Sequence, residues 1–315
     1  MKKNIYVYSP SGAVRDKAAF RRGVSRLKAL GHEVAIDQNA LSSHMRFAGD
    51  DETRVAAFER AAASGADIAL ISRGGYGITR ILDRIPYKAI AKSIASGTHF
   101  VGISDFTAFQ LALYAKTGSV SWAGPALCEG FGALPSPDDI MEDCFNDLLL
   151  GQGEGAGWRL PPVRVSTVQG SKVSADAEWG ISNATLWGGN LAVLVSLIGT
   201  PYFPEVKGGV LFLEDVSEPP YRVERMLTQL LQTGILARQK AILMGQFTEY
   251  KLTPHDKGFK LNTVFNWLQS HVKAPILTNL PYGHVQTKVL LPFGAKVDLV
   301  LQGRDALMAW GHLKA

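Results

Sequence analysis

A serine at position 104 lies where an apolar strand is expected to turn directly into a helix. Residues 100–103 predict the short buried strand, and apolar residues at helical spacing predict a helix that ends at Gly118. Such a turn exposes a serine hydroxyl at the carboxyl end of a sheet and directs the next backbone N–H groups toward whatever the serine attacks. These features are typical of a nucleophile elbow, although Phe106 stands where the G-x-S-x-G pattern has its second glycine. A serine that only caps a helix is the equally compatible interpretation of the pattern alone.

A hydroxyl nucleophile needs a general base, and histidine serves most often because its pKa lies near neutrality. The chain has seven histidines. Most of them fall in polar loops, and His99 begins the strand before Ser104, where we expect it to pack. His284 differs because it lies between an expected buried strand at 275–280 and an expected hairpin at 289–301. The residues alone make it one candidate among seven.

A third group has to orient the histidine, and a carboxylate usually does so. Glu214 directly follows an expected apolar strand at 209–213. Enzymes of the α/β class place functional side chains at the carboxyl ends of their strands. Asp215 and Glu218 lie close behind, and a solvated carboxylate that begins a loop is the alternative interpretation of all three.

A glycine-rich loop, R-G-G-Y-G at 73–77, precedes a helix expected over 78–85. The backbone N–H groups of such a loop can bind a phosphate or a carboxylate. The loop has neither the G-x-G-x-x-G order nor the P-loop order. The chain has no H-E-x-x-H motif and no Cys/His cluster, so we expect no metal and no cofactor.

The composition narrows the class of protein. The 315 residues are 46% hydrophobic and carry a net charge of +5, with no basic run that would indicate a nucleic-acid partner. The most apolar stretch, near 191–199, is too short to span a membrane, and the N-terminal apolar run is too short for a signal peptide. Two cysteines without a C-x-x-C motif are typical of reduced thiols. We therefore expect a cytoplasmic protein with no membrane and no nucleic-acid partner.

Strands and helices alternate in the first half, which predicts α/β units on a parallel sheet. Right-handed crossovers bring the loops after the strands to one edge, so the glycine-rich loop and Ser104 are expected to share that edge. The segment 151–162 is rich in glycine and ends in two prolines, which is typical of a linker. We expect it to join a domain at 1–150 to one at 163–315, the second beginning with a strand near 163–168.

Five blocks of the chain resemble those of the L,D-carboxypeptidases, in the same order from Tyr8 to about Val300. They are RGGYG, GISDFTAF, LWGGNLAVLVSLIGTPY, LFLEDVSEPPYRVERML and PYGHVQTKVLLPFGA. The resemblance implies a flavodoxin-like N-terminal domain, a smaller α/β C-terminal domain, an active site between them, and a homodimer.

The resemblance also implies a Ser-Glu-His triad made of Ser104, Glu214 and His284. The first two lie in the G-I-S-D and L-E-D blocks, and the third lies in the G-H block. The backbone N–H groups of Gly75 and Asp105 would form the oxyanion hole.

Substrate contacts are expected at Gly74, Tyr76 and Asn190, which lie in the same blocks. The resemblance is strongest to the branch of the family that acts on murein tetrapeptides. It implies release of the terminal D-alanine in peptidoglycan recycling. Two alternatives remain: a self-immunity peptidase that cleaves a peptide–nucleotide antibiotic, and a muropeptide-binding protein of the same fold without turnover.

Overall fold

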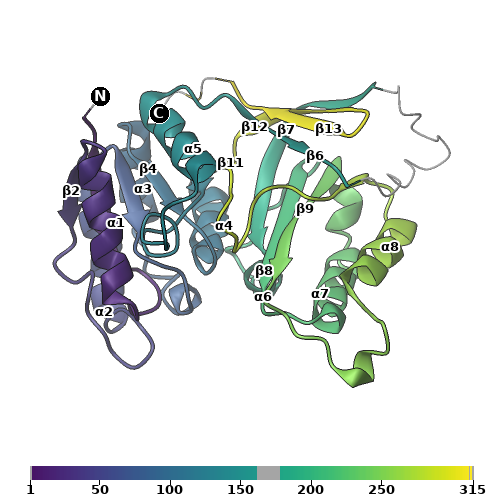
Figure 1. The fold of residues 1–315 in the computed structure, drawn as a ribbon, viewed down its shortest axis with the longest axis horizontal. Coiled ribbons are helices and arrows are strands. Elements are labelled where there is room, and N and C mark those ends of the chain that lie inside the picture. The colour runs from purple at the N-terminus through teal and green to yellow at the C-terminus, as the bar shows by residue number, and fades with distance from the viewer. Residues whose placement is uncertain (1, 162–177, 312, 314–315) are drawn as a thin grey trace.

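The computed structural model describes residues 2–161, 178–311 and 313. The strand expected near 163–168 lies outside these residues. Two sheets lie side by side with their helices, and Figure 1 shows the N-terminal one on the left. The strands are β1 (Asn4–Tyr8), β2 (Glu33–Ile36), β3 (Ile68–Ile71), β4 (His99–Gly102), β5 (Ser121–Ala123), β6 (Gly155–Arg159), β7 (Glu178–Asn190), β8 (Val210–Val216), β9 (Ala241–Thr248), β10 (Ile276–Leu277), β11 (Leu291–Phe293), β12 (Lys296–Gln302) and β13 (Asp305–Ala309). The helices are α1 (Lys17–Ala29), α2 (Asp51–Ala63), α3 (Tyr87–Ala95), α4 (Phe106–Thr117), α5 (Asp139–Leu150), α6 (Leu191–Ser196), α7 (Pro220–Gln232) and α8 (Leu261–His271), with 3₁₀ turns at Ile78–Arg80, Leu236–Arg238 and Pro254–Asp256.

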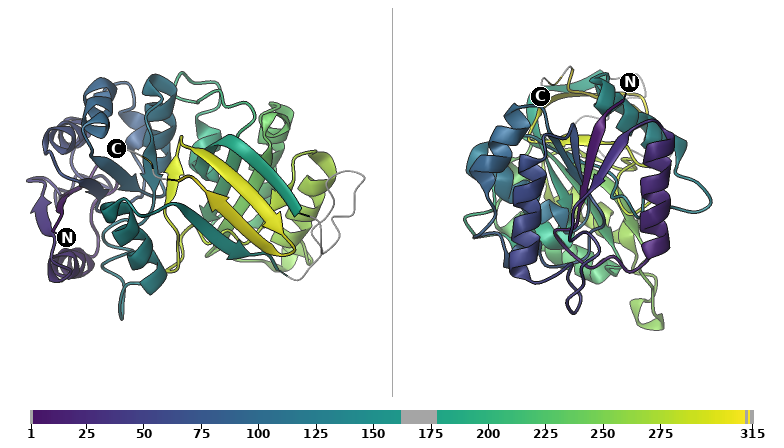
Figure 2. Two further views of the ribbon diagram at one scale, coloured as in Figure 1. Left: turned by 90° about the horizontal axis from the view of Figure 1, so that it is seen from above. Right: turned by 90° about the vertical axis from the view of Figure 1, so that its left-hand side faces the viewer.

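The first sheet has the strand order β11-β5-β4-β3-β1-β2, and the pairs among β1 to β5 are all parallel. The order 2-1-3-4-5 is that of flavodoxin-like folds. Helices cover both faces of this sheet, as the right-hand view of Figure 2 shows. The prediction of a flavodoxin-like N-terminal part with a second α/β part is therefore confirmed.

Apolar side chains fill the space between this sheet and each layer of helices. On one face, α1 and α5 bury Phe20, Leu27 and Phe145 in one cluster. On the other face, Phe58 of α2 stacks on Phe109 of α4 with their ring centroids 4.9 Å apart. This second cluster continues into the C-terminal sheet, so one core holds α4 against both sheets.

The second sheet has the order β10-β9-β8-β7-β12-β13-β6. Strands β7 to β10 are parallel, and β12, β13 and β6 extend the sheet in antiparallel fashion. The predicted linker at 151–162 contains β6, which is the edge strand beside β13. The left-hand view of Figure 2 shows β12 and β13, in yellow, with the teal β6 and β7.

The hairpin expected over 289–301 is wrong, because its two halves belong to different sheets. Strand β11 pairs with β5 in the first sheet, whereas β12 pairs with β7 and β13 in the second. The burial patterns give the reason. All three residues of β11 are buried, as in a strand covered on both faces, while β12 alternates between buried and exposed residues. The turn between them uses Gly294 at a φ of +93°.

The helix expected over 78–85 is also wrong, since the structure has only the 3₁₀ turn Ile78–Arg80 there. Pro86 disfavours a helical conformation at the residue before it, so little chain is left for an α-helix. Helix α3 begins directly after this proline.

Candidate active site

Ser104 lies in the sharp turn between β4 and α4 with a φ of +68°. Residues other than glycine rarely adopt this left-handed conformation, and those that do cluster at functional sites. Gly102 permits a close approach behind the turn, because a Cβ there would lie 2.6 Å from the Phe106 ring. Phe106 is fully buried. It therefore fills the space behind the elbow, which explains a phenylalanine in place of the second glycine.

The glycine-rich loop packs directly against the nucleophile candidate. A Cβ on Gly74 would lie 2.5 Å from the Cβ of Ser104, and Gly75 has a φ of +118°. Both glycines are therefore required by the geometry of the loop. The loop after β3 and the turn after β4 share one edge, as the alternation of strands and helices predicts. The oxyanion role of the N–H groups of Gly75 and Asp105 stays a prediction.

Replacing Gly74 with alanine is expected to lower kcat by roughly a hundredfold, because the new methyl group displaces Ser104 from its attacking position. The backbone of Gly74 lies outside the left-handed region, so its φ and ψ angles permit alanine and the close contact with Ser104 is the expected cause of the loss. The kcat and the melting temperature of the variant would be measured on the same preparation. Gly153→Ala is the matched control, since a Cβ there meets no heavy atom closer than 3.7 Å. A Gly74→Ala enzyme with wild-type kcat would show that the loop moves without affecting Ser104.

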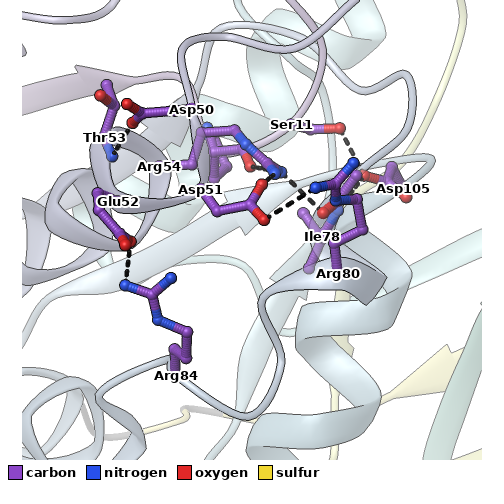
Figure 3. A network of polar contacts seen from close by, with 12 residues as sticks. Ser11, Asp50, Asp51, Glu52, Thr53, Arg54, Ile78, Arg80, Arg84 and Asp105 are labelled. Carbon is purple, nitrogen blue, oxygen red and sulfur yellow. Dashed lines mark hydrogen bonds and ion pairs between the residues drawn. The ribbon is translucent and has the colours of Figure 1, made fainter.

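The Asp105 side chain connects the loop after β1 to the end of the glycine-rich loop. Its carboxylate accepts hydrogen bonds from Ser11 Oγ, in the loop after β1, and from the backbone N–H of Ile78 at 3.0 Å. Burial raises the pKa of this carboxyl group, and the two hydrogen bonds act in the opposite direction. Figure 3 shows both contacts. In the sequence, the only indication of this role is an aspartate that directly follows the serine.

An arginine supports the same loop from behind. Arg54 is fully buried, and its Nη1 donates to the carbonyl oxygen of Gly77 at 2.7 Å. It also pairs with Asp51, which lies 3.1 Å from Arg80, as Figure 3 shows. Arg54, a residue of α2, thus fixes the position of Gly77, the last glycine of the loop.

On the C-terminal side, His284 Nδ1 lies 2.7 Å from Glu214 Oε2. The Glu214 side chain is 0% exposed, on β8, and His284 lies in the loop between β10 and β11. Burial lowers the pKa of His284, but the charge of Glu214 and its hydrogen bond together bring that pKa above its usual value. The structure therefore pairs the predicted base with the predicted acid. Strand β8 continues through Glu214 to Val216 and does not end before it.

Asn190 holds the other oxygen of that carboxylate. Its Nδ2 donates to Glu214 Oε1 at 3.2 Å, and its Oδ1 accepts from the N–H of Val193 at 3.1 Å. Its own N–H donates to Thr107 Oγ1 on α4 at 3.0 Å. Asn190 thus connects the helix that follows Ser104 to the acid. Its predicted contact with substrate stays a prediction, and the structure shows it as a buried neighbour of Glu214.

Tyr76 is the second residue at which a substrate contact is expected. Its side chain is 45% exposed and packs beside the Phe47 ring, with the Arg46 guanidinium 5.6 Å from its ring centre. Tyr76 is not among the described residues that line the cavity around Ser104, and its contact with substrate remains a prediction.

Asp215, the neighbour of Glu214, is a second buried carboxyl group. It accepts from the backbone N–H groups of Ala192 at 2.8 Å and Val216 at 2.7 Å. Burial and the charge of Glu214 raise the pKa of Asp215 to about 7. The folded protein therefore binds a proton here over a range of pH in which an unfolded aspartate does not.

A raised carboxyl pKa predicts that the free energy of unfolding falls as pH rises from about 4 to about 7, by at most about 4 kcal/mol from Asp215. The fall is expected to be smaller in Asp215→Asn, measured by urea unfolding at several pH values. Asp105, whose pKa is also raised, keeps part of the slope in the variant. An identical slope in both proteins would mean that Asp215 titrates in its ordinary range.

A cavity of about 550 Å³ opens between the two sheets, and both halves of the chain line it. Ser104, Gly74 and Gly75 contribute from the first half, and His284 and Ser217 contribute from the second. A hydroxyl, an imidazole backed by a buried carboxylate, and a glycine-rich loop thus meet in one cavity. These are the groups that acyl transfer to a serine requires.

Comparison with known proteins places this arrangement in a family. Residues 5–124 match the LD-carboxypeptidase N-terminal domain, and residues 183–299 match the LD-carboxypeptidase C-terminal domain. The protein belongs to the LD-carboxypeptidase family, and it is a peptidase of that family.

Three relatives illustrate the similarity. The muramoyltetrapeptide carboxypeptidase from Oxalobacter formigenes has a crystal structure that is 35% identical, with a TM-score of 0.83 over 99% of this chain and 100% of its own. The murein tetrapeptide carboxypeptidase of Pseudomonas aeruginosa is 30% identical over 73% of this chain and 71% of its own length. The microcin C7 self-immunity protein MccF of Escherichia coli is 24% identical over 94% of this chain and 90% of its own length.

Within 2–161 and 178–311, no three His, Cys, Asp or Glu side chains gather as a set that could hold a metal ion. None of the helices in the same residues has the length and apolar character needed to cross a bilayer.

Proposed function

We propose that this protein is a serine-type L,D-carboxypeptidase that releases the terminal D-alanine of a murein tetrapeptide in peptidoglycan recycling. The observation that carries the proposal is the 2.7 Å contact between His284 and the buried Glu214, at the wall of the cavity that Ser104 also lines. Family membership and the names of the Oxalobacter and Pseudomonas relatives support the substrate class. We further propose that the protein acts in the cytoplasm as a homodimer, without metal or cofactor.

In this mechanism Ser104 Oγ attacks the carbonyl carbon of the last peptide bond, and His284 takes its proton. Glu214 keeps the imidazole in the required tautomer and stabilises the imidazolium that forms. The backbone N–H groups of Gly75 and Asp105 bind the oxyanion of the tetrahedral intermediate. The imidazolium then protonates the leaving D-alanine nitrogen, which leaves an acyl ester on Ser104. Water, activated by His284, hydrolyses this ester and restores the enzyme.

The direct test is incubation of the purified protein with murein tetrapeptide, followed by mass spectrometry of the products. Tripeptide and free D-alanine are expected in equal amounts. A tetrapeptide that ends in L-alanine is the control for stereochemistry. Faster cleavage of this control than of the natural peptide would overturn the L,D assignment.

The two alternative functions give different outcomes in the same assay. Preferential hydrolysis of an aminoacyl sulfamoyl adenosine would indicate a self-immunity peptidase. Binding of tetrapeptide without turnover, together with no labelling of Ser104 by a fluorophosphonate, would indicate a binding protein. Labelling of Ser104 together with D-alanine release is the result that the proposal predicts.

A further inference from the structure

A buried lysine lines the same cavity. Lys288 follows His284 by four residues and is 3% exposed. Across the described part of the chain it makes no hydrogen bond and has no carboxylate within ion-pair distance. Its Nζ is not one of the fully buried polar atoms that lack a partner in the described residues, so the ammonium group still reaches the cavity and can bind an anion there.

The other cations of the cavity are placed differently. Arg73 donates a hydrogen bond from Nη1 to the Ala13 carbonyl oxygen at 3.3 Å. Its Nε also forms an ion pair with Glu129 at 3.7 Å. Arg15 is exposed. Among the described cavity residues, Lys288 is therefore the cation that is both buried and unpaired.

The proposed reaction requires an anion at this place. In a carboxypeptidase substrate the free carboxylate lies one residue beyond the bond that is cut, and one residue spans at most about 3.6 Å. The group that binds this carboxylate must therefore lie in the cavity that holds Ser104. Lys288 and Ser104 line that one cavity.

We propose that Lys288 binds the terminal carboxylate of the substrate and thereby limits the enzyme to the last peptide bond. The proposal rests on the carboxypeptidase function and names its specificity residue. Removal of this lysine leaves a substrate carboxylate unpaired in the cavity, whereas a substrate without that charge loses nothing.

The surroundings of Lys288 agree with this role. Burial lowers the pKa of its ammonium group, and the more distant carboxylates of Glu129, Glu214 and Asp138 only partly offset this effect. A bound carboxylate would favour the charged form directly. Lys288 also lowers the pKa of His284. A lysine that only adjusts the base is therefore the competing explanation that an experiment has to separate.

The test compares two substrates in three proteins. Tetrapeptide with a free terminal carboxylate and its terminal amide are hydrolysed by wild type, Lys288→Met and Arg15→Met. In Lys288→Met the kcat/KM for the free acid is expected to fall by roughly a hundredfold, mainly through KM, while that for the amide changes little. Arg15→Met is expected to keep the wild-type ratio of acid to amide.

An equal loss on both substrates, with a displaced acidic limb of the kcat/KM profile, would overturn the proposal and assign Lys288 to the adjustment of His284. Because Lys288 is buried, melting temperatures are measured, and Lys288→Gln replaces the methionine variant if that variant unfolds. Binding measured by calorimetry in Ser104→Ala, with and without Lys288→Met, gives the acid preference without turnover. Wild type that releases no D-alanine, yet binds the acid better than the amide through Lys288, would contradict the proposed function and not this inference.

Discussion

Replacement of Ser104 by alanine is expected to lower the turnover of murein tetrapeptide by on the order of a million-fold, as loss of the nucleophile does in other triads. No other group in the turn can form the acyl ester, and the remaining residues contribute only binding and oxyanion stabilisation. The fold should survive, because alanine adopts the φ of +68° at position 104 about as readily as serine does. D-Alanine release, fluorophosphonate labelling and the melting temperature would be measured on the same preparation.

Ser217 provides the matched control, since it also lines the cavity with a hydroxyl group and has a φ of +66°. Ser217→Ala is expected to remain labelled by the fluorophosphonate and to release D-alanine. A Ser104→Ala protein that keeps a tenth of the wild-type rate would remove Ser104 from the role of nucleophile. Loss of labelling in Ser217→Ala instead would assign that role to Ser217.

Much of the first sheet could be predicted from the sequence, because local signals determine it. Alternating strands and helices, closed by residues such as Gly118 in the left-handed conformation, indicate parallel βα units. The pairing of β11 with β5 could not be predicted in this way. This pairing brings Pro292 beside Trp122, which is far away in the sequence. The residues of a strand alone do not indicate which of two sheets the strand joins.

The site shows the same division between local and distant information. The turn at Ser104 follows from adjacent residues, whereas the meeting of Glu214 and His284 depends on how β8 and the loop after β10 pack. The role of Asn190 does have a local signal in the sequence. Asparagine before an apolar helix is a preferred N-cap, and Asn190 caps α6.

That N-cap has a consequence for catalysis, because it fixes how Asn190 faces the acid. The N–H of Val193 occupies its Oδ1, so its Nδ2 faces the carboxyl groups of Glu214 and Asp215, at 3.2 Å and 3.3 Å. One local helix signal thus orients a donor toward Oε1 and leaves Oε2 for His284. The N–H of Asn190 donates to Oγ1 of Thr107, three residues after Ser104. This hydrogen bond fixes the position of the Glu214 side of the site relative to the helix that follows Ser104.

This arrangement predicts the effect of Glu214→Gln, which is expected to lower turnover by roughly ten-thousand-fold, as the tautomer-disrupting change does in a related triad. A glutamine has one acceptor and one donor where the carboxylate has two acceptors. Since Asn190 presents a donor, the glutamine oxygen turns toward it and the NH₂ group faces His284 Nδ1. The imidazole then carries its proton on Nε2 and cannot accept the one from Ser104. The kcat, the pH profile and the melting temperature would be measured.

Glu218→Gln is the control for this prediction, and it is expected to change turnover by less than about threefold, because a partly exposed ion pair that does not contact His284 contributes little to turnover. Glu218 pairs with Arg222 on the first turn of α7, with Oε2 2.6 Å from Nε, and has no contact with His284. If Glu218→Gln were the inactive variant and Glu214→Gln the active one, the acid would be Glu218. The 2.7 Å contact of Glu214 would then hold His284 in a resting position, and the histidine would have to turn toward α7 before Ser104 could react.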